Sequence, residues 1–177
     1  MKSIWISEEA FTSLVTEANR VYPLETGGVL LGYFAENGEP VVFTNIGPGP
    51  AGVHLRTRFT PDHSWQCKQI DLAFEKSNGT LAYMGDWHTH PDTSPQMSWL
   101  DQRTLRTIAR HPQARTSQPL MLIGGGTPQN WTWISHQYRG ERLLGLIVDC
   151  EQHELRSFRS EEAVLHGWHN DSPSSSK

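Results

Sequence analysis

Two histidines one residue apart, followed by a Ser-x-x-Asp, are the residues of this sequence best suited to chemistry. They lie in the stretch GDWHTHPDTSPQMSWLD, which contains His88, His90, Ser98 and Asp101. The residues that lead to the second histidine, 80–90, are predicted to form a strand. Because the side chains of a strand alternate between its faces, His88 and His90 point to the same side. Two imidazoles on one face at the end of a strand can share a metal ion.

Asp101 supplies a third donor to the same place. The segment 92–97 lets the chain turn, and Ser98 stands where a helix begins. The Asp101 carboxylate, one turn into that helix, can therefore face back toward His88 and His90. Two imidazole nitrogens and one carboxylate oxygen leave a fourth tetrahedral position for water, as in a catalytic zinc site. A structural zinc site is usually closed by thiolates, and neither cysteine of the chain is near in sequence.

Each half of this pattern also has an ordinary explanation. Ser98-x-x-Asp101 is close to a helix capping box, with Asp in place of the usual Glu. An isolated H-x-H on a strand is unremarkable in a chain with 9 histidines. The two halves at this spacing rarely occur together by chance, so the combination favours a metal centre.

Hydrolysis at such a centre needs a base that is not itself a ligand, and Glu25 is the best candidate. It lies in LETGGVLLG, before a Gly-Gly and an apolar strand. The glycines let the backbone pack closely while the carboxylate stays at the beginning of the strand. An acid/base group of this kind must lie within hydrogen-bond reach of the proton that it moves. A solvated glutamate at the start of a strand is the alternative.

Composition narrows the classes of protein. A chain of 177 residues with 36% hydrophobic and 19% charged residues fits one soluble domain. The net charge of -4 and the lack of a Lys/Arg cluster argue against a nucleic-acid binder. Cys67 and Cys150 form no disulfide framework, which favours a reducing cytoplasm. The stretch MKSIWISEEAF lacks the long apolar run of a signal peptide, and no apolar run reaches about 18 residues, so we expect neither a signal peptide nor a membrane span.

Strands and helices alternate along the chain, which predicts one mixed α/β domain over residues 1–160. The last residues, 161–177, are polar and predict a solvated, disordered tail. The predicted helices are one capped by Ser7 and closed by Pro23, one at 62–78 and one at 99–110. The predicted strands are 2–6, 27–34, 40–47, 80–90, 119–123, 130–137 and 143–148, with a polar loop at 47–61.

ETGGVLLG, then WHTHP, then S-x-x-D resembles the JAMM signature of the JAB/MPN-domain zinc metalloenzymes, without departure from the pattern. The resemblance covers residues 7–126 and rests beyond them on general strand pattern. It implies that His88, His90 and Asp101 bind one Zn²⁺, that Glu25 is the general base, and that Ser98 stabilises the tetrahedral oxyanion. It also implies the family's fold, a single mixed curved β-sheet flanked by helices and similar to the deaminase-like architecture.

The family's chemistry is hydrolysis of amide or isopeptide bonds that follow the carboxy terminus of ubiquitin or a ubiquitin-like protein. Small bacterial-type members resembling this chain are associated with ubiquitin-like conjugation systems, including antiphage systems. The resemblance therefore implies a modifier or its conjugate as substrate, with homologues of activating and conjugating enzymes as companions. Two alternatives remain: a hydrolase of sulfur-carrier proteins in cysteine or thiocarboxylate metabolism, and a non-catalytic MPN scaffold.

A protease that cuts after a flexible tail must hold that tail extended, and pairing it with a strand is an economical way. In the family, a segment between the glutamate and the H-x-H forms part of the groove. Here that segment is 47–60, which is rich in Gly and Pro and carries Arg56 and Arg58. We expect one of these arginines to contact substrate. The alternative is that both are solvated loop charges.

Overall fold

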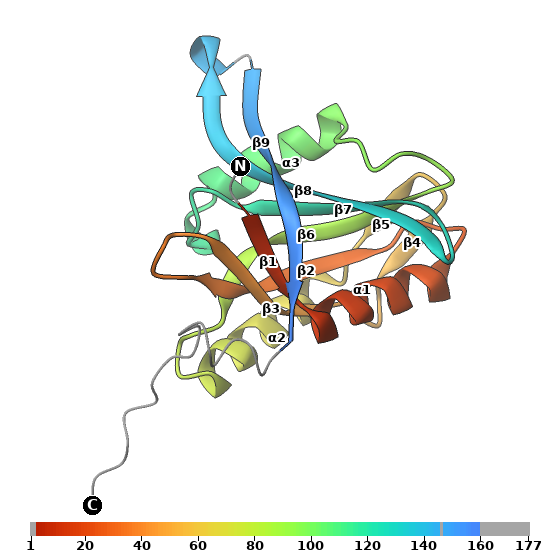
Figure 1. The fold of residues 1–177 in the computed structure, drawn as a ribbon, viewed down its shortest axis with the longest axis horizontal. Helices are drawn as coiled ribbons and strands as arrows, with labels where there is room; N and C mark the ends of the chain where they lie inside the picture. Colours follow the sequence, from red (N-terminus) through yellow and green to blue (C-terminus); the bar gives the residue numbers. More distant parts are fainter. Residues whose placement is uncertain (1–2, 146, 160–177) are drawn as a thin grey trace, which may run out of the picture.

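Seven strands pair side by side until the last meets the first, so that a mixed sheet closes into a barrel (Figure 1). The computed structural model describes residues 3–145 and 147–159. Around the barrel the strands follow the order β1-β3-β2-β6-β7-β8-β9, and parallel pairing of β1 with β9 closes the ring. A separate two-stranded sheet is formed by β4 and β5.

The strands of the barrel are β1 (Ser3–Ser7), β2 (Gly27–Phe34), β3 (Pro40–Ile46), β6 (Ala82–Pro91), β7 (Leu120–Thr127), β8 (Asn130–Arg142) and β9 (Ile147–Phe158). The small sheet consists of β4 (Val53–Leu55) and β5 (Arg58–Thr60). The helices are α1 (Glu8–Val21), α2 (His63–Lys76) and α3 (Trp99–Arg110), with short 3-10 turns η1 (Pro112–Ala114) and η2 (Leu143–Gly145).

Local sequence signals set several of these boundaries. Ser7 caps α1, because its hydroxyl oxygen accepts a hydrogen bond from the Ala10 N–H at 3.0 Å. Asp62 caps α2 in the same way through the Trp65 N–H. The turn between β2 and β3 contains Asn37 and Gly38, and Gly38 has a φ of 79°, which favours glycine. The predicted beginnings of these helices and the predicted hairpin are confirmed.

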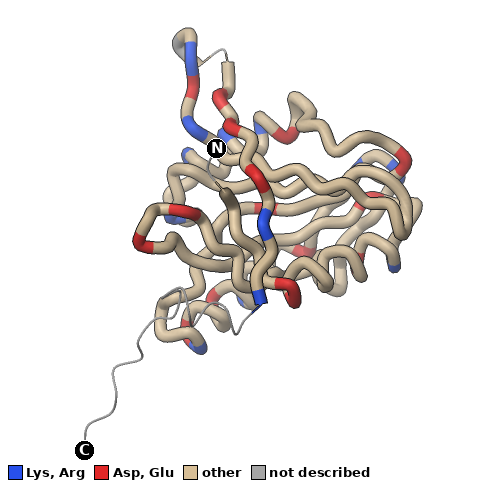
Figure 2. Tube along the Cα trace, in the orientation of Figure 1, with Lys and Arg blue, Asp and Glu red and all other residues tan. Residues whose placement is uncertain are grey.

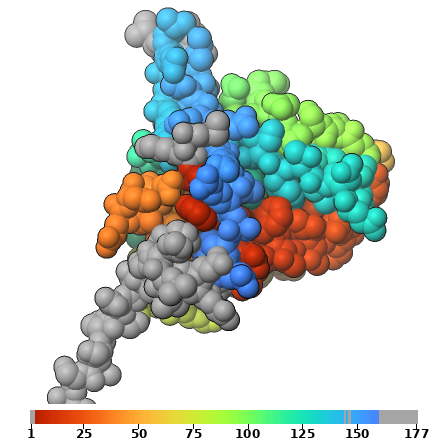
Figure 3. Space-filling model, viewed as in Figure 1, coloured from red at the N-terminus to blue at the C-terminus, as the bar shows by residue number. Residues whose placement is uncertain are grey.

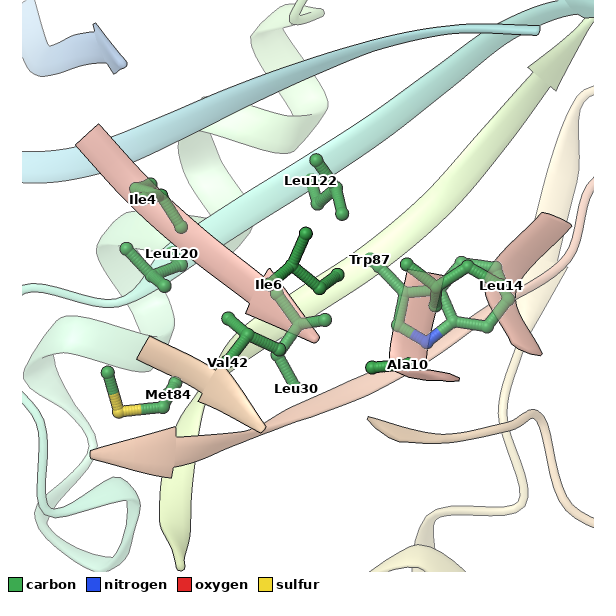
Figure 4. Packing of buried hydrophobic residues seen from close by; sticks show 10 residues of the cluster. All are labelled: Ile4, Ile6, Ala10, Leu14, Leu30, Val42, Met84, Trp87, Leu120 and Leu122. Atoms are coloured by element: carbon green, nitrogen blue, oxygen red, sulfur yellow. The ribbon is translucent and has the colours of Figure 1, made fainter. Parts of the chain in front are cut away.

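The main core lies inside the barrel and is covered at one end by α1 (Figure 4). Ala10 and Leu14 of α1 pack against the inward side chains of the strands, among which Trp87 is 1% exposed. A second cluster lies outside the barrel, where Leu105 of α3 packs on Met121 and Ile123 of β7. Apolar side chains are therefore buried on both faces of β7, which pairs with β6, the strand that carries the histidines of the candidate site.

The predicted curved sheet flanked by helices needs one correction, since the mixed sheet is a closed barrel. Closure depends on β9, which runs from Ile147 to Phe158, whereas the sequence predicted only a strand at 143–148. Much of β9 is exposed and polar, so its sequence lacks an apolar alternation that would indicate a strand. Residues 143–145 form the 3-10 turn η2 instead.

The predicted loop at 47–61 is also corrected, because it contains the β4–β5 hairpin. Strands of only three residues, with exposed side chains at most positions, give too short a pattern to be recognised. The predicted tail at 161–177 lies outside the described residues. No helix among the described residues has the length and apolar character needed to cross a bilayer.

The end of β8 and the beginning of β9 form a long hairpin that projects from the barrel (Figure 3). Its two arms are joined by ion pairs, Arg139 with Glu151 and Arg142 with Asp149, both at 2.7 Å. Figure 2 shows that basic and acidic residues are interspersed over the described chain rather than gathered in a basic stripe.

We predict that Gly28→Ala destabilises the protein, because a Cβ at this position would meet the carbonyl oxygen of Ile46 and, at 2.8 Å, the Nε1 of Trp87. Crowding of this kind should lower the free energy of unfolding by about 1–3 kcal/mol. Gly47→Ala is the matched control, since a Cβ there has no neighbour within 4 Å. Urea denaturation measures both variants. Equal stabilities of the two would show that the close approach at Gly28 is unimportant.

Candidate metal centre

The end of β6 carries the two histidines on its outer face. The Nε2 atoms of His88 and His90 are 3.0 Å apart, and the ring centroids are separated by 4.8 Å. The residues between and before them, Thr89 and Trp87, point inward and are 0% and 1% exposed. The strand alternation predicted for this segment is therefore confirmed, and the inward residues fix the histidines in place.

Asp101 faces the histidines from the first turn of α3. Its Oδ1 lies 3.2 Å from the Nε2 of His88, and its Oδ2 lies 3.9 Å from the Nε2 of His90. The capping box is present as well, since the Asp101 N–H donates to Ser98 Oγ at 3.2 Å and the Ser98 N–H donates to Oδ2 of Asp101 at 2.7 Å. The Ser98 hydroxyl also donates to Oδ2 at 2.7 Å. The structural and the functional explanations of Ser98-x-x-Asp101 are thus compatible, because Oδ2 serves the cap while Oδ1 is directed toward His88.

The loop between the histidines and α3 needs small residues beneath it. His90 of β6 is paired in register with Gly125 of β7. A Cβ on Gly125 would collide with the backbone of Ser94 and Pro95 in the loop above. Gly125 at the end of β7 therefore lets residues 92–98 cross the sheet and return Asp101 to the histidines.

Glu25 reaches the same place through the pairing of β2 with β6. Gly27 is paired with His88, and this pairing is extended by hydrogen bonds between Thr26 and Thr89. A Cβ on Gly27 would lie 2.5 Å from the carbonyl oxygen of Trp87. The Gly-Gly that follows Glu25 thus permits the close approach expected from the sequence. Thr26 is 0% exposed, whereas Glu25 is only partly buried.

Three titratable groups of the centre, Glu25, Asp101 and His90, have displaced pKa values. Burial raises the pKa of the Glu25 carboxyl from 4.5 to about 7, an effect that His88 opposes and Asp101 reinforces. For Asp101, burial also favours the neutral form, but the hydrogen bond and charge of His88 and the bonds from Ser98 prevail and lower the pKa to about 2. Burial and the neighbouring His88 lower the pKa of His90.

These residues fit a divalent cation. The donor atoms of His88, His90 and Asp101 all lie within 4.8 Å of one another. Neutral imidazoles and an ionised carboxylate are the forms that bind metals, and the displaced pKa values favour them for His90 and Asp101. Glu25 lies close enough to His88 and Asp101 to interact with their charges, and its raised pKa of about 7 in the metal-free protein suits an acid/base role.

Arg56 lies at the tip of the β4–β5 hairpin and forms an ion pair with Asp92, with Nη2 to Oδ2 at 3.4 Å. The other carboxylate oxygen of Asp92 accepts a hydrogen bond from the Tyr22 hydroxyl at 2.6 Å. Asp92 follows the end of β6 directly, so the hairpin tip is connected to the loop beyond the histidines. Arg58, at the start of β5, is exposed.

Sequence analysis missed His54 and Phe59 of the same hairpin. His54 contacts the backbone of Glu25 and stacks on Phe59. The only signal was the alternation in HLRTRFT, which is too short to indicate a hairpin. Both residues belong to the surroundings of the base.

The sequence of the described fold and site matches a known protein family. Residues 7–136 match the family model described as prokaryotic homologs of the JAB domain. The chain belongs to the JAMM family of JAB-domain proteins, as its sequence motif predicted.

Three proteins that are similar in sequence have names that state an enzymatic activity. A probable metalloprotease of Sinorhizobium fredii is 38% identical over 147 residues, covering 81% of this chain and 90% of its own. A CD-NTase/cGAS isopeptidase of Enterobacter hormaechei is 31% identical over 126 residues, covering 71% of this chain and 69% of its own. One from Escherichia coli with the same name is 36% identical over 120 residues, covering 66% and 70%.

A solved structure supports the fold alone. The solution structure of a protein from Desulfitobacterium hafniense superposes with a TM-score of 0.64 at 18% sequence identity. The match covers 89% of this chain and 94% of the other.

The raised pKa of Glu25 predicts a distinctive pH dependence of stability in the metal-free protein. Between pH 4.5 and about 7 the folded state keeps a proton that the unfolded chain has lost. The stabilising contribution is complete below the unfolded pKa and disappears as the pH rises through about 7. Glu25→Gln should remove this fall in the free energy of unfolding.

Urea denaturation of metal-free protein across that pH range measures the effect, and carboxyl ¹³C NMR locates the titration directly. Asp101 gives the opposite sign, with stability lost as the pH falls toward about 2, so the two groups are separable. An unchanged pH profile in Glu25→Gln would contradict the assignment.

Proposed function

We propose that this protein is a zinc-dependent peptidase that hydrolyses the amide or isopeptide bond after the carboxy terminus of a ubiquitin-like protein. The observation that carries the proposal is the convergence of His88, His90 and Asp101 within 4.8 Å, beside a glutamate with a pKa of about 7. Such a protein would remove a modifier from its conjugate or process its precursor.

Each residue of the site has a separate role in the proposed hydrolysis. His88, His90 and Asp101 would hold the ion, which when bound polarises a carbonyl and acidifies water. Glu25 takes the proton of the attacking water and returns it to the leaving amine nitrogen. In the metal-free protein burial raises the pKa of its carboxyl to about 7, so the carboxyl can hold a proton near neutral pH.

Ser98 has a further role in the proposal. In the structure its hydroxyl donates to Asp101 at 2.7 Å. To stabilise an oxyanion the hydroxyl must turn toward it, while the Ser98 N–H, also 2.7 Å from Oδ2, retains the contact with Asp101. The capping interaction therefore keeps Asp101 in place when the hydroxyl is used elsewhere.

A protein substrate is supported by the surroundings of the site. Val53 and Leu55 of the hairpin are each 52% exposed, and Leu55 accepts a hydrogen bond from the Glu25 backbone. Trp99 and Leu100, which directly precede Asp101, are 71% and 54% exposed. Exposed apolar residues on both sides of a catalytic centre are typical of a binding surface. They suit an extended apolar tail better than a small polar substrate.

The relatives named CD-NTase/cGAS isopeptidases support the biological setting of the proposal. By analogy, the substrate is a protein conjugate, the companions are activating and conjugating enzyme homologues, and the system is antiphage defence. The proposed compartment is the cytoplasm.

The activity test uses zinc-loaded protein and three substrates: a ubiquitin-like protein in isopeptide linkage, its linear carboxy-terminal fusion, and a sulfur-carrier protein loaded with cysteine. We expect cleavage of the first two directly after the carboxy terminus. Glu25→Gln should bind zinc and fold normally but lower kcat by about 10²–10⁴-fold. Cleavage of the sulfur carrier alone would favour the alternative hydrolase, and cleavage of none would leave a scaffold.

The hairpin arginines give a separate prediction about recognition. Arg56→Ala and Arg58→Ala should raise KM for the protein-linked substrate by about 10-fold, with little effect on a minimal peptide, because only the longer substrate extends to these two arginines. Arg56→Ala also breaks the contact with Asp92. Asp92→Asn therefore serves as the control that weakens the ion pair but retains the arginine. If KM changes equally for both substrates, the hairpin takes no part in recognition.

A further inference from the structure

The backbone of Glu25 is held on both sides by one strand of the small hairpin. Its N–H donates to the carbonyl oxygen of Leu55 at 2.8 Å, and its own carbonyl oxygen lies 2.9 Å from Nδ1 of His54. A carbonyl only accepts hydrogen bonds, so Nδ1 of His54 must carry the proton and donate. Glu25 itself lies outside regular secondary structure, in the segment before β2.

His54 is in turn held by an aromatic contact. Its ring stacks on Phe59 of β5, with centroids 5.4 Å apart and an interplanar angle of 27°. The Phe59 ring covers Gly27, where an added Cβ would lie 3.0 Å from Cδ1 of Phe59 and 3.0 Å from Cβ of His88. A continuous set of contacts therefore joins the backbone of Glu25 to the strand that carries the histidines.

Apart from its contacts with Glu25 and Gly27, the hairpin is attached at its tip by the exposed ion pair between Arg56 and Asp92. Its strands are three residues each and pair only with one another, apart from the barrel. An isolated two-stranded hairpin is marginally stable in water. The bond from His54 to Glu25 therefore restrains two segments at once, the hairpin and the irregular segment that contains the base.

We propose that His54 is a positioning residue for Glu25, an inference that rests on the proposed function. Through Nδ1 it fixes the backbone from which the Glu25 carboxylate extends. Displacement of a reacting group by about 1 Å can cost about 10²-fold in rate. A substrate that engages the hairpin then meets a base already in place, and His54 contributes to kcat without being a ligand or a proton carrier.

Two substitutions separate the hydrogen bond from the ring. His54→Phe retains an aromatic ring to stack on Phe59 but has no donor for the Glu25 carbonyl. His54→Asn loses the ring but places an amide N–H the same number of bonds from the backbone as Nδ1. His111→Phe and His111→Asn are the matched controls, since His111 is exposed at the far end of α3.

The kinetic measurement uses zinc-loaded full-length protein and the isopeptide-linked substrate. We expect His54→Phe to lower kcat by about 10-fold to 10²-fold while KM changes by less than about threefold. His54→Asn should stay within about threefold of the wild type in both constants, as should the two His111 variants. Zinc content should be equal in all of them.

A second measurement does not depend on activity. The Glu25 N–H, donated to Leu55, reports whether the hairpin is closed on the base, so its hydrogen exchange is followed by NMR in the metal-free protein. Exchange at Glu25 should become about 10-fold faster in His54→Phe and remain unchanged in His54→Asn.

The two measurements distinguish failure of this inference from failure of the proposed function. Unchanged exchange in His54→Phe, or equal effects of the Phe and Asn variants, would overturn the positioning role. Normal kcat in His54→Phe despite faster exchange would overturn its contribution to catalysis. If the wild type cleaves no substrate but exchange follows the expected pattern, His54 positions Glu25 and the proposed function is wrong.

Discussion

The antiparallel pairing of β2 with β6 is the constraint on which the candidate site depends. It brings Gly27 opposite His88 and allows Thr26 and Thr89 to hydrogen-bond beyond it. This approach is possible only because positions 27 and 28 have no side chain that would collide with neighbouring backbone. Glu25 is thereby brought beside the histidines, although the two segments are far apart in sequence. Thr26 and Thr89, which join them, are separated by 63 residues. Without that register the base and the ligands would belong to unrelated parts of the surface.

Asp101 shows how one side chain can serve stability and chemistry together. Oδ2 receives both the N–H and the hydroxyl of Ser98, which anchors the start of α3. Oδ1 is left to face His88, and the resulting interactions keep the carboxyl ionised even though it is buried. The capping box therefore directs the carboxylate, and Gly125 of β7 makes room for the loop that precedes α3. The β4–β5 hairpin also combines two roles, because the hydrogen bonds that attach β4 to the segment before β2 restrain the backbone of Glu25.

Much of the site could be predicted from the sequence because its signals are local. H-x-H on a strand places two imidazoles on one face, and Ser-x-x-Asp defines a helix start; the structure brings His88, His90 and Asp101 together accordingly. Barrel closure could not be predicted, since it depends on pairing between β1 and a β9 whose exposed side chains are mostly polar. The role of His54 could not be predicted for a related reason. It acts through a main-chain carbonyl 29 residues away, and no spacing of residue types encodes that contact.

The central claim is that three side chains from β6 and α3 hold a zinc ion that Glu25 does not bind. X-ray diffraction from crystals of protein purified without chelator, recorded on both sides of the zinc absorption edge, tests it directly. We predict one anomalous peak per chain that is present only above the edge, at about 2.1 Å from the Nε2 atoms of His88 and His90 and from an oxygen of Asp101. The Glu25 carboxylate should lie outside that coordination distance. Absence of the peak, or a peak that includes Glu25 among its ligands, would contradict the account.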